Sequence, residues 1–392
     1  MKKILMLLAG VLTAFPALAQ QTTSPTTEDP QNVRNQRFVS VMPTYQTWNL
    51  EANPDETNKL SQISNQLLVY YQVNNQVLLS LRNTHGTFSA TCKDCTYTVP
   101  ETSLSGLGDT QVSVSYRLPS PNLIFNATVN LPTGRSSVSA SELETLGLFS
   151  NQVLAFKLPT LGQGTAIMTG VSGAFPLNDQ VVMGGGLSYI VNSGFRPLAD
   201  YDYTYKPGNE VTADLGLNLR VGNNGSLGVD AMLTSYQEDV FVDQSVFKAG
   251  NKFSMVLQYR QLNPTSEWSA MLRYRSRAKN AVAQFIGDKP LEEAVNTNPA
   301  VMIARGTYRM GLDKQFVPGF TAELRSYEAT PAWLSGALVF GFGFEPDFRV
   351  SNSVLVPLRI RYVMGNVANE KYYPTFGSLR ELSASVGLYW SF

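Results

Sequence analysis

The chain has 392 residues, of which 43% are hydrophobic and 15% charged, and its 30 basic side chains balance 30 acidic ones beside a single His. This balance argues against a nucleic-acid-binding protein. The mean hydropathy is near zero, so no set of apolar helices is available for a helical membrane protein.

The N-terminus has the pattern of a secretory signal peptide. Lys2 and Lys3 precede an apolar run that begins at Ile4, and Ala17 and Ala19 supply small residues for cleavage before Gln20. We predict that residues 1–19 are a signal peptide and that the protein is exported. Residues 20–36 are polar and rich in Gln, Thr, Asn and Pro, which predicts a flexible periplasmic leader.

The two cysteines, Cys92 and Cys95, are separated by two residues. In an exported chain this spacing favours a local disulfide, whereas in the cytosol it would indicate redox or metal chemistry. A zinc site would need carboxylates to complete it, because the chain has one His. We therefore predict neither a metal site nor a cofactor.

From residue 37 onward, segments of roughly ten residues alternate between apolar and polar side chains, as the strands of outer-membrane barrels do. The strands of a soluble β-sandwich would alternate in the same way, so the connections between the segments must distinguish a sandwich from a barrel. Seven short connections with turn residues, such as Asn74-Asn75 and Asn223-Asn224-Gly225, alternate with eight long ones. The long ones are expected at 51–61, 91–107, 136–163, 195–209, 239–250, 283–300, 328–336 and 366–377.

This alternation of short and long loops is typical of an up-and-down barrel with tight periplasmic turns and long extracellular loops. We predict that residues 37–392 form an all-β, antiparallel transmembrane β-barrel of about 16 strands. A count of 14 remains possible, because the boundaries near 150–163 and 337–350 are uncertain.

His85 is the one imidazole available as a general base, and no Ser follows it at a spacing that indicates a lipase. The alternative is a solvated residue at the end of a strand. The sequence also has no GxSxG, HExxH or phosphate-binding glycine loop. We predict that the protein is not an enzyme.

Three short motifs lie between residues 100 and 195: Gly106-Leu107-Gly108-Asp109, Leu131-Pro132-Thr133-Gly134 and Gly162-Gln163-Gly164. With Tyr116-Arg117-Leu118, they resemble the outer-membrane proteins of the phenol meta-cleavage pathway, distant relatives of long-chain fatty-acid transporter barrels. The resemblance implies passive import of small hydrophobic or aromatic molecules. Residues 20–36 do not match the Asn-Pro-Ala segment that such transporters fold into the lumen.

Two long loops contain patterns of short helices. Ser141 and Glu144 have the spacing of a capping box before apolar residues. The second pattern, at 288–295, has Pro290 near its start. Their apolar residues are expected either to capture a ligand or to pack over the barrel mouth.

Arginines alternate with apolar residues on the late strands. Since Trp268, Leu272 and Tyr274 are expected to face lipid, the arginines between them face the lumen. An arginine in mid-membrane lipid would cost about 2–4 kcal/mol. The same parity predicts a lumen charge cluster of Arg220, Arg260, Arg273, Arg275, Arg277, Arg305, Arg309, Arg325, Arg359, Arg361, Glu323 and Glu381.

This cluster has two interpretations. The charges form cross-strand ion ladders that brace the barrel, or arginines in excess over inward carboxylates bind an anionic solute. Asp214 and Asp230 lie on inward faces too and can pair with part of the set.

The last segment ends in Trp390 and Phe392. An aromatic residue that closes an alternating strand resembles the signal that outer-membrane barrels present to the barrel assembly machinery. Its apolar face comprises Leu382, Ala384, Val386, Leu388, Trp390 and Phe392.

We therefore expect a monomeric channel in the outer membrane of a Gram-negative bacterium, in contact with outer-membrane lipid, for passive uptake of small hydrophobic, aromatic or anionic molecules. The alternative is a structural or adhesive surface barrel with a closed lumen. A general porin would need a loop that constricts the lumen from within, and the sequence does not identify one.

Overall fold

The computed structural model describes residues 37–53, 56–93, 102–119, 122–158, 161–312, 314–330, 335–367 and 378–392. The predicted signal peptide, the predicted leader and Cys95 lie outside these residues, as does the side chain of Cys92. The leader and the disulfide stay predictions.

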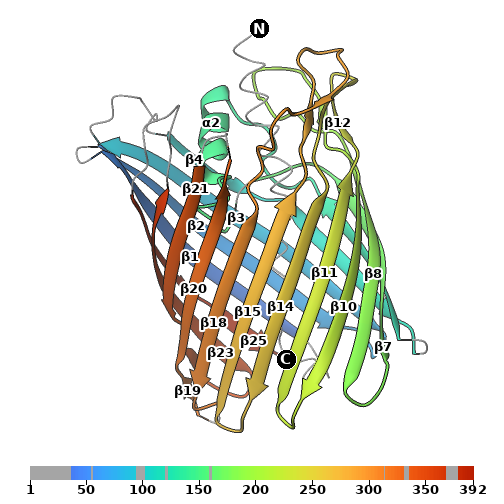
Figure 1. Cartoon of the computed structure of the whole chain (residues 1–392), viewed down its shortest axis with the longest axis vertical. Coiled ribbons are helices and arrows are strands. Elements are labelled where there is room, and N and C mark those ends of the chain that lie inside the picture. Colours follow the sequence, from blue (N-terminus) through green and yellow to red (C-terminus); the bar gives the residue numbers. More distant parts are fainter. Residues whose placement is uncertain are drawn as a thin grey trace.

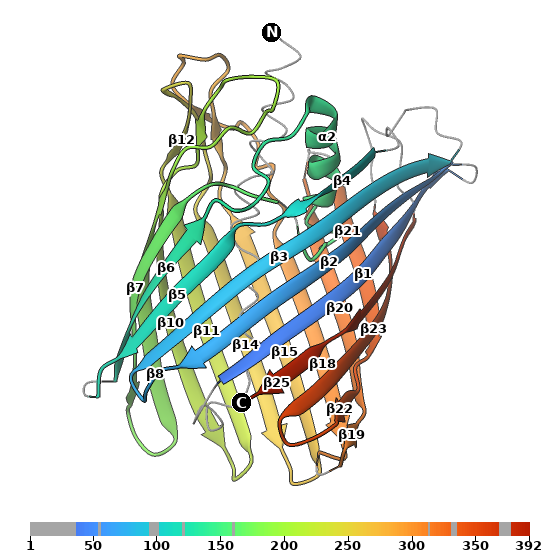
Figure 2. The same cartoon turned by 180° about the vertical axis from the view of Figure 1, so that it is seen from behind.

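Sixteen antiparallel strands form a closed barrel, as predicted (Figures 1 and 2). Four of them are interrupted, so that β4 continues into β5, β19 into β20, β21 into β22 and β24 into β25. The wall consists of β1 (Arg37–Asn53), β2 (Glu56–Gln72), β3 (Val77–Lys93), β4 (Thr102–Leu107), β5 (Thr110–Arg117), β6 (Leu123–Leu131), β7 (Ala166–Pro176), β8 (Val181–Asn192), β10 (Glu210–Val221), β11 (Gly225–Tyr236), β14 (Lys252–Leu262), β15 (Ser266–Arg277), β18 (Val301–Met310), β19 (Phe316–Val317), β20 (Gly319–Ala329), β21 (Ser335–Phe344), β22 (Asp347–Arg349), β23 (Val354–Val367), β24 (Ser378–Val386) and β25 (Leu388–Ser391).

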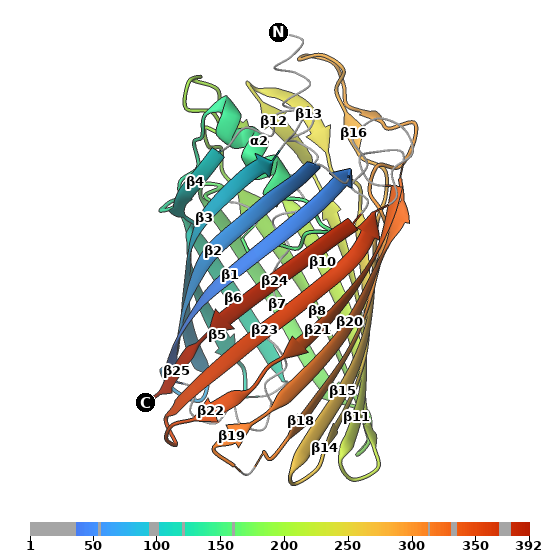
Figure 3. The ribbon, with the colours of Figure 1, turned by 90° about the vertical axis from the view of Figure 1, so that its left-hand side faces the viewer.

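The barrel closes between the first and last strands (Figure 3). Thr44 pairs with Ser385 on β24, and Val39 pairs with Trp390 on β25. The backbone N–H of Phe392 donates to the carbonyl oxygen of Arg37 at 3.0 Å. Closure leaves no open sheet edge in the membrane. An open edge would expose unpaired backbone N–H and C=O groups to lipid, where they have no hydrogen-bond partner.

The predicted parity of the strands is confirmed. Leu382, Val386 and Trp390 on the last strand are 47–50% exposed, while Glu381, which directly precedes Leu382, is 3% exposed. Aromatic pairs such as Tyr259 with Trp268, at 4.7 Å between ring centroids, lie on the outer face near the short turns. An outer band of apolar and aromatic side chains of this kind faces lipid.

Local chemistry explains the short turns. The side-chain oxygen of Asn74 accepts the backbone N–H groups of Gln76 and Val77 at 2.8 and 2.9 Å. Asn178 does the same at the turn before β8. These Asx turns satisfy the backbone donors where the ladder ends.

The predicted long loop at 51–61 is wrong, because β1 and β2 pair almost to their ends. Leu50 and Leu60 are buried on the inner face, 5% and 1% exposed, so apolar contacts extend the pairing. Residues 102–107, also expected in a loop, form β4. It pairs with β3, and α2 packs beside it.

A second sheet lies above the barrel at the end with the long loops, which is the extracellular end (Figure 1). Tyr205 and Phe247 are fully buried in it. Its strands are β9 (Tyr205–Lys206), β12 (Glu238–Phe241), β13 (Gln244–Lys248), β16 (Ala281–Val282) and β17 (Leu291–Glu292).

The predicted helix at 288–295 is wrong. Residues 291–292 form β17, and the backbone N–H of Glu293 donates to the carbonyl oxygen of Asn280 at 2.9 Å. The Glu293 carboxylate also accepts the backbone N–H of Asn280 at 3.2 Å. The segment thus forms its hydrogen bonds with the neighbouring strand, and a helix at these residues would break them.

Asp239 on β12 is buried in this sheet. Its carboxylate accepts the hydroxyl of Tyr205 and, at 2.6 Å, the backbone N–H of Gly208. Burial raises the pKa of Asp239 from 3.8 to about 6, although both hydrogen bonds and the charge of Arg277 act in the opposite direction. The extracellular sheet therefore contains a carboxyl group that titrates near neutral pH.

Within the described residues, the one helix is α2 (Ala140–Phe149), and no helix there is both long and apolar enough to cross a membrane.

Candidate functional site

The connection between β6 and β7, residues 132–165, carries α2 and folds toward the barrel interior; we call it the inner loop (Figure 2). Its helix begins at a capping box, two residues earlier than predicted. Ser139 Oγ accepts the backbone N–H of Glu142 at 3.3 Å, and the Glu142 carboxylate accepts the backbone N–H of Ser139 at 2.8 Å. Arg135 adds an ion pair to Glu142 at 2.8 Å.

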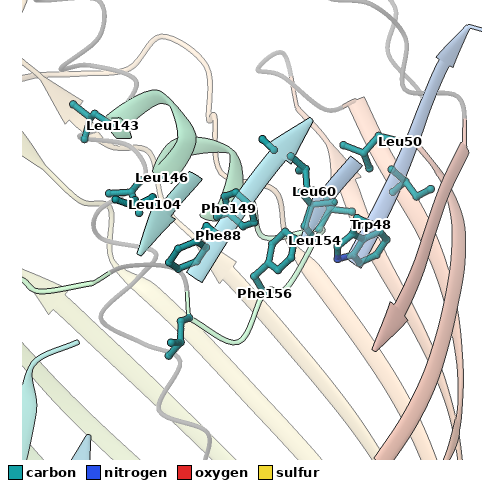
Figure 4. Packing of buried hydrophobic residues seen from close by; sticks show 14 of the residues in the cluster. Trp48, Leu50, Leu60, Phe88, Leu104, Leu143, Leu146, Phe149, Leu154 and Phe156 are labelled. Atoms are coloured by element: carbon teal, nitrogen blue, oxygen red, sulfur yellow. The ribbon is translucent and has the colours of Figure 1, made fainter. Parts of the chain in front are cut away.

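Apolar side chains seat the inner loop against the inner face of β1, β2 and β3 (Figure 4). Phe149 packs on Phe88 and on Phe156, with ring centroids 4.8 and 4.6 Å apart. Trp48 and Phe88 have no exposed surface. Each such side chain contributes roughly 1.5–3 kcal/mol when it is buried, so the inner loop is held firmly.

Two glutamines on the inner face of the wall bind the backbone of the inner loop. The Gln46 amide donates to the carbonyl oxygens of Leu154 and Ala155 at 3.4 and 3.2 Å, and its oxygen accepts the N–H of Lys157 at 3.3 Å. Gln62 both donates to and accepts from the backbone of Leu158. Ala155 has φ +47°, a left-handed conformation that non-glycine residues rarely adopt.

The inner loop also reaches the other side of the wall at Gln152. Tyr327 donates its hydroxyl proton to the carbonyl oxygen of Gln152 at 3.0 Å, and Arg275 donates to its side-chain oxygen at 2.7 Å. Arg325 donates to the carbonyl oxygen of Val153 at 3.3 Å. The stretch 152–158 therefore spans the lumen from β1 and β2 to β15 and β20. An inner loop that crosses the lumen, which the sequence did not reveal, is present.

The three motifs noted in the sequence meet at the base of the inner loop. The Asp109 carboxylate accepts the backbone N–H of Gly134 at 3.0 Å and that of Gln163 at 2.6 Å. A Cβ on Gly134 would lie 2.7 Å from the backbone nitrogen of Asp109, and one on Gly162 would lie 2.8 Å from the carbonyl carbon of Gly134. These glycines are required because three backbone segments touch there.

The late strands carry a ladder of paired charges on the lumen face. Arg305 pairs with Glu345 at 3.1 Å, and Arg309 pairs with Asp347 at 3.2 Å. Arg359 binds both carboxylates, at 3.6 and 2.7 Å. Glu345 and Asp347 were missed in the sequence because they flank Pro346 at the interruption between β21 and β22, although they continue the inward parity of β21.

A second part of the ladder is buried under the inner loop. Glu323 accepts from Arg325 at 2.5 Å and from Arg361, and its side chain is 8% exposed. Glu381, 3% exposed, lies 3.9 Å from Arg325 and accepts from Gln46 at 3.0 Å. Much of the predicted cluster is therefore paired in two neighbouring groups, and the buried one also supports the inner loop.

The remaining predicted arginines lie on earlier strands. Arg260 pairs with Glu267 at 2.7 Å. Arg277 stacks over the ring of Tyr236, 5.2 Å from its centroid. Arg273 lies on the inner face of β15 between Leu272 and Tyr274, and Arg220 is exposed near the short turn that follows β10. Arg220 is thus distant along the wall from the ladder.

His85 lies on the outer face within β3, and it is exposed. The expectation that it ends a strand is wrong. In the part of the chain that the structure describes, no three His, Cys, Asp or Glu side chains gather so as to hold a metal ion.

The part of the wall from β7 to β11 has small and polar side chains on its inner face. Asp214, Asn218 and Asp230 point inward by register, yet all three are exposed. Asp214 lies against Gly186, where a Cβ would approach its carboxylate to 2.7 Å. Side chains that are enclosed by the barrel but exposed must contact lumen water, so this part of the wall is wet.

A cavity of about 790 Å³ opens at the extracellular ends of β6, β7 and β8. Its lining comes from the base of the inner loop, including Pro132 and Thr165, and from residues 193–202. The cavity therefore lies on the same side of the barrel as the wet part of the wall.

Comparison with known proteins finds no matching family model and no matching curated protein. Solved structures match over nearly the whole chain at low identity. A mutant of the TodX monoaromatic hydrocarbon channel is 12% identical, with 91% of each chain covered and a TM-score of 0.47. A loop-deletion mutant of OmpT, an outer-membrane protein of Vibrio cholerae, is 9% identical, covers 90% of this chain and 98% of its own, and has a TM-score of 0.43.

A third match, an outer-membrane channel from Pseudomonas putida F1, is 11% identical and covers 93% of this chain and all of its own, with a TM-score of 0.39. Matches this distant carry no information on solutes. The closed wall and its apolar outer band show that the chain is an integral outer-membrane β-barrel.

Proposed function

We propose that the protein is a passive channel in which small molecules enter through the extracellular cavity and pass along the β7–β11 side of the lumen. The observation that carries this proposal is the exposure of Asp214, Asn218 and Asp230 inside the barrel. The inner loop constricts the opposite side, where it is bound to β1, β2, β15 and β20. The path is therefore narrow and lined by polar groups, which favours small solutes over large ones.

The channel is tested by reconstitution of the folded protein into planar bilayers. We expect discrete steps of ion current, and we expect vesicles that contain the protein to take up small aromatic and carboxylate solutes. A correctly folded sample with no current and no uptake would instead favour the alternative, a structural or adhesive barrel closed by its inner loop and charge ladder.

A further inference from the structure

The strands β14 and β15 bring four cationic side chains together on the lumen face beside the inner loop. Lys252 pairs in register with Arg277, and Arg275 and Arg273 follow at the next inward positions of β15. Gln152 of the inner loop contacts Arg275 from the lumen side at 2.7 Å. The group thus lies where the inner loop reaches this wall.

These cations differ from the arginines of the ladder in their partners. Among the described residues, no carboxylate oxygen lies within 4.0 Å of Lys252, Arg273 or Arg275. Two carboxylates act on the group electrostatically: Glu210 on Lys252, and Asp239 on Arg277. Three arginines and Lys252 against two carboxylates leave a larger positive excess than in the neighbouring ladder, where five arginines meet four carboxylates: Arg305, Arg309, Arg325, Arg359 and Arg361 with Glu323, Glu345, Asp347 and Glu381.

The group surrounds a small niche. A space of about 20 Å³ is lined by Gln152, Lys252, Arg275 and Arg277, and by Asn298 of the loop above. Lys252 is 6% exposed, so its amino group is buried. A space of this size holds about one water-sized group, so it can admit one oxygen of a carboxylate and not a whole solute.

We propose that Lys252, Arg275 and Gln152 form a subsite for the carboxylate of a small organic acid in transit through the channel; this rests on the proposed function and names its substrate class. Arg275 would bind the carboxylate through its free N–H groups, in the planar geometry that guanidinium and carboxylate share. Lys252 supplies a second basic group from the wall, and Gln152 orients Arg275.

The test compares block of the ion current by benzoate, phosphate and the neutral benzyl alcohol in the native protein and in Arg275→Gln. We expect an anion-selective reversal potential in a salt gradient and saturable block by benzoate. Loss of one charge-assisted contact should raise the half-blocking benzoate concentration about tenfold. Phosphate should block weakly and benzyl alcohol not at all.

Arg309→Gln is the matched control, because it removes the same charge from the neighbouring strand while Asp347 stays paired with Arg359. It should leave the benzoate block within about twofold of the native value. An equal loss in both variants, or equal block by phosphate, would overturn the subsite. If the protein carries no current, calorimetric titration of the native protein and Arg275→Gln with benzoate decides the subsite separately from the channel.

Discussion

Removal of the central part of the inner loop is expected to raise the single-channel conductance severalfold. The change replaces residues 140–158 with a short glycine-serine linker and keeps the contacts of Asp109 with Gly134 and Gln163 at the loop base. Conductance should rise because the variant lacks the segment that spans the lumen between its contacts with Gln46 on β1 and Arg275 on β15. Recordings in planar bilayers measure the effect.

A second variant keeps the chain length in case the deletion does not fold. Gln46→Leu with Gln62→Leu removes the side-chain bonds from β1 and β2 to the inner loop, each worth about 1–3 kcal/mol when its buried partner is left unsatisfied. We expect a larger and noisier current. Asn65→Leu, an amide on the outer face of β2, is the control and should leave the current unchanged. Native conductance in the folded deletion variant would mean that the inner loop does not constrict the path.

Glu323→Gln is expected to destabilise the barrel by about 3 kcal/mol or more. Glu323 is the common partner of Arg325 and Arg361, and its side chain is 8% exposed. Its neutralisation therefore leaves two guanidinium groups without the negative charge that compensates them at a buried site. Glu381, 3.9 Å from Arg325, compensates only in part. Urea unfolding in lipid vesicles, followed by tryptophan fluorescence, measures the loss.

The comparison variant is Glu267→Gln. Its partner Arg260 is 22% exposed and Glu267 itself 21%, so water replaces the lost charge and the expected cost is below about 1 kcal/mol. Equal losses in the two variants would contradict the view that the ladder under the inner loop is a buried brace.

The face of each strand that meets lipid was predictable, because lipid tolerates apolar side chains and not charged ones. Guanidinium groups on the outer face would meet hydrocarbon, so the alternation of Arg273 with Leu272 and Tyr274 already assigns both faces. The turns at Asn74 and Asn178 were predictable because their side chains replace backbone partners locally.

The inner loop was not predicted, because its contacts join residues about a hundred positions apart. Gln46 and Leu154 are separated by 108 positions, and nothing local to either residue indicates the other. One signal was present. Trp48, Leu50 and Leu60 are apolar at inward positions, and a water-filled barrel would not place them there without a cover.

The charge cluster was predicted as one set, whereas the structure divides it into two parts. The parity placed the arginines inward, yet it could not tell which carboxylates they would meet, because Glu345 and Asp347 lie at an interruption of the strand. That pairing distinguishes the braced ladder from the cations beside Gln152.

The most direct measurement compares cysteines at two adjacent positions of β10, Asp214→Cys and Leu215→Cys, in a background with Cys92→Ser and Cys95→Ser. A charged, membrane-impermeant thiol reagent is added to the folded protein in a bilayer while the current is recorded. Asp214→Cys should react and its current should change, because the side chain faces lumen water, whereas Leu215→Cys, which faces lipid, should stay unmodified. Reaction at position 215 with none at 214 would contradict both the parity of the wall and the wet path inside it.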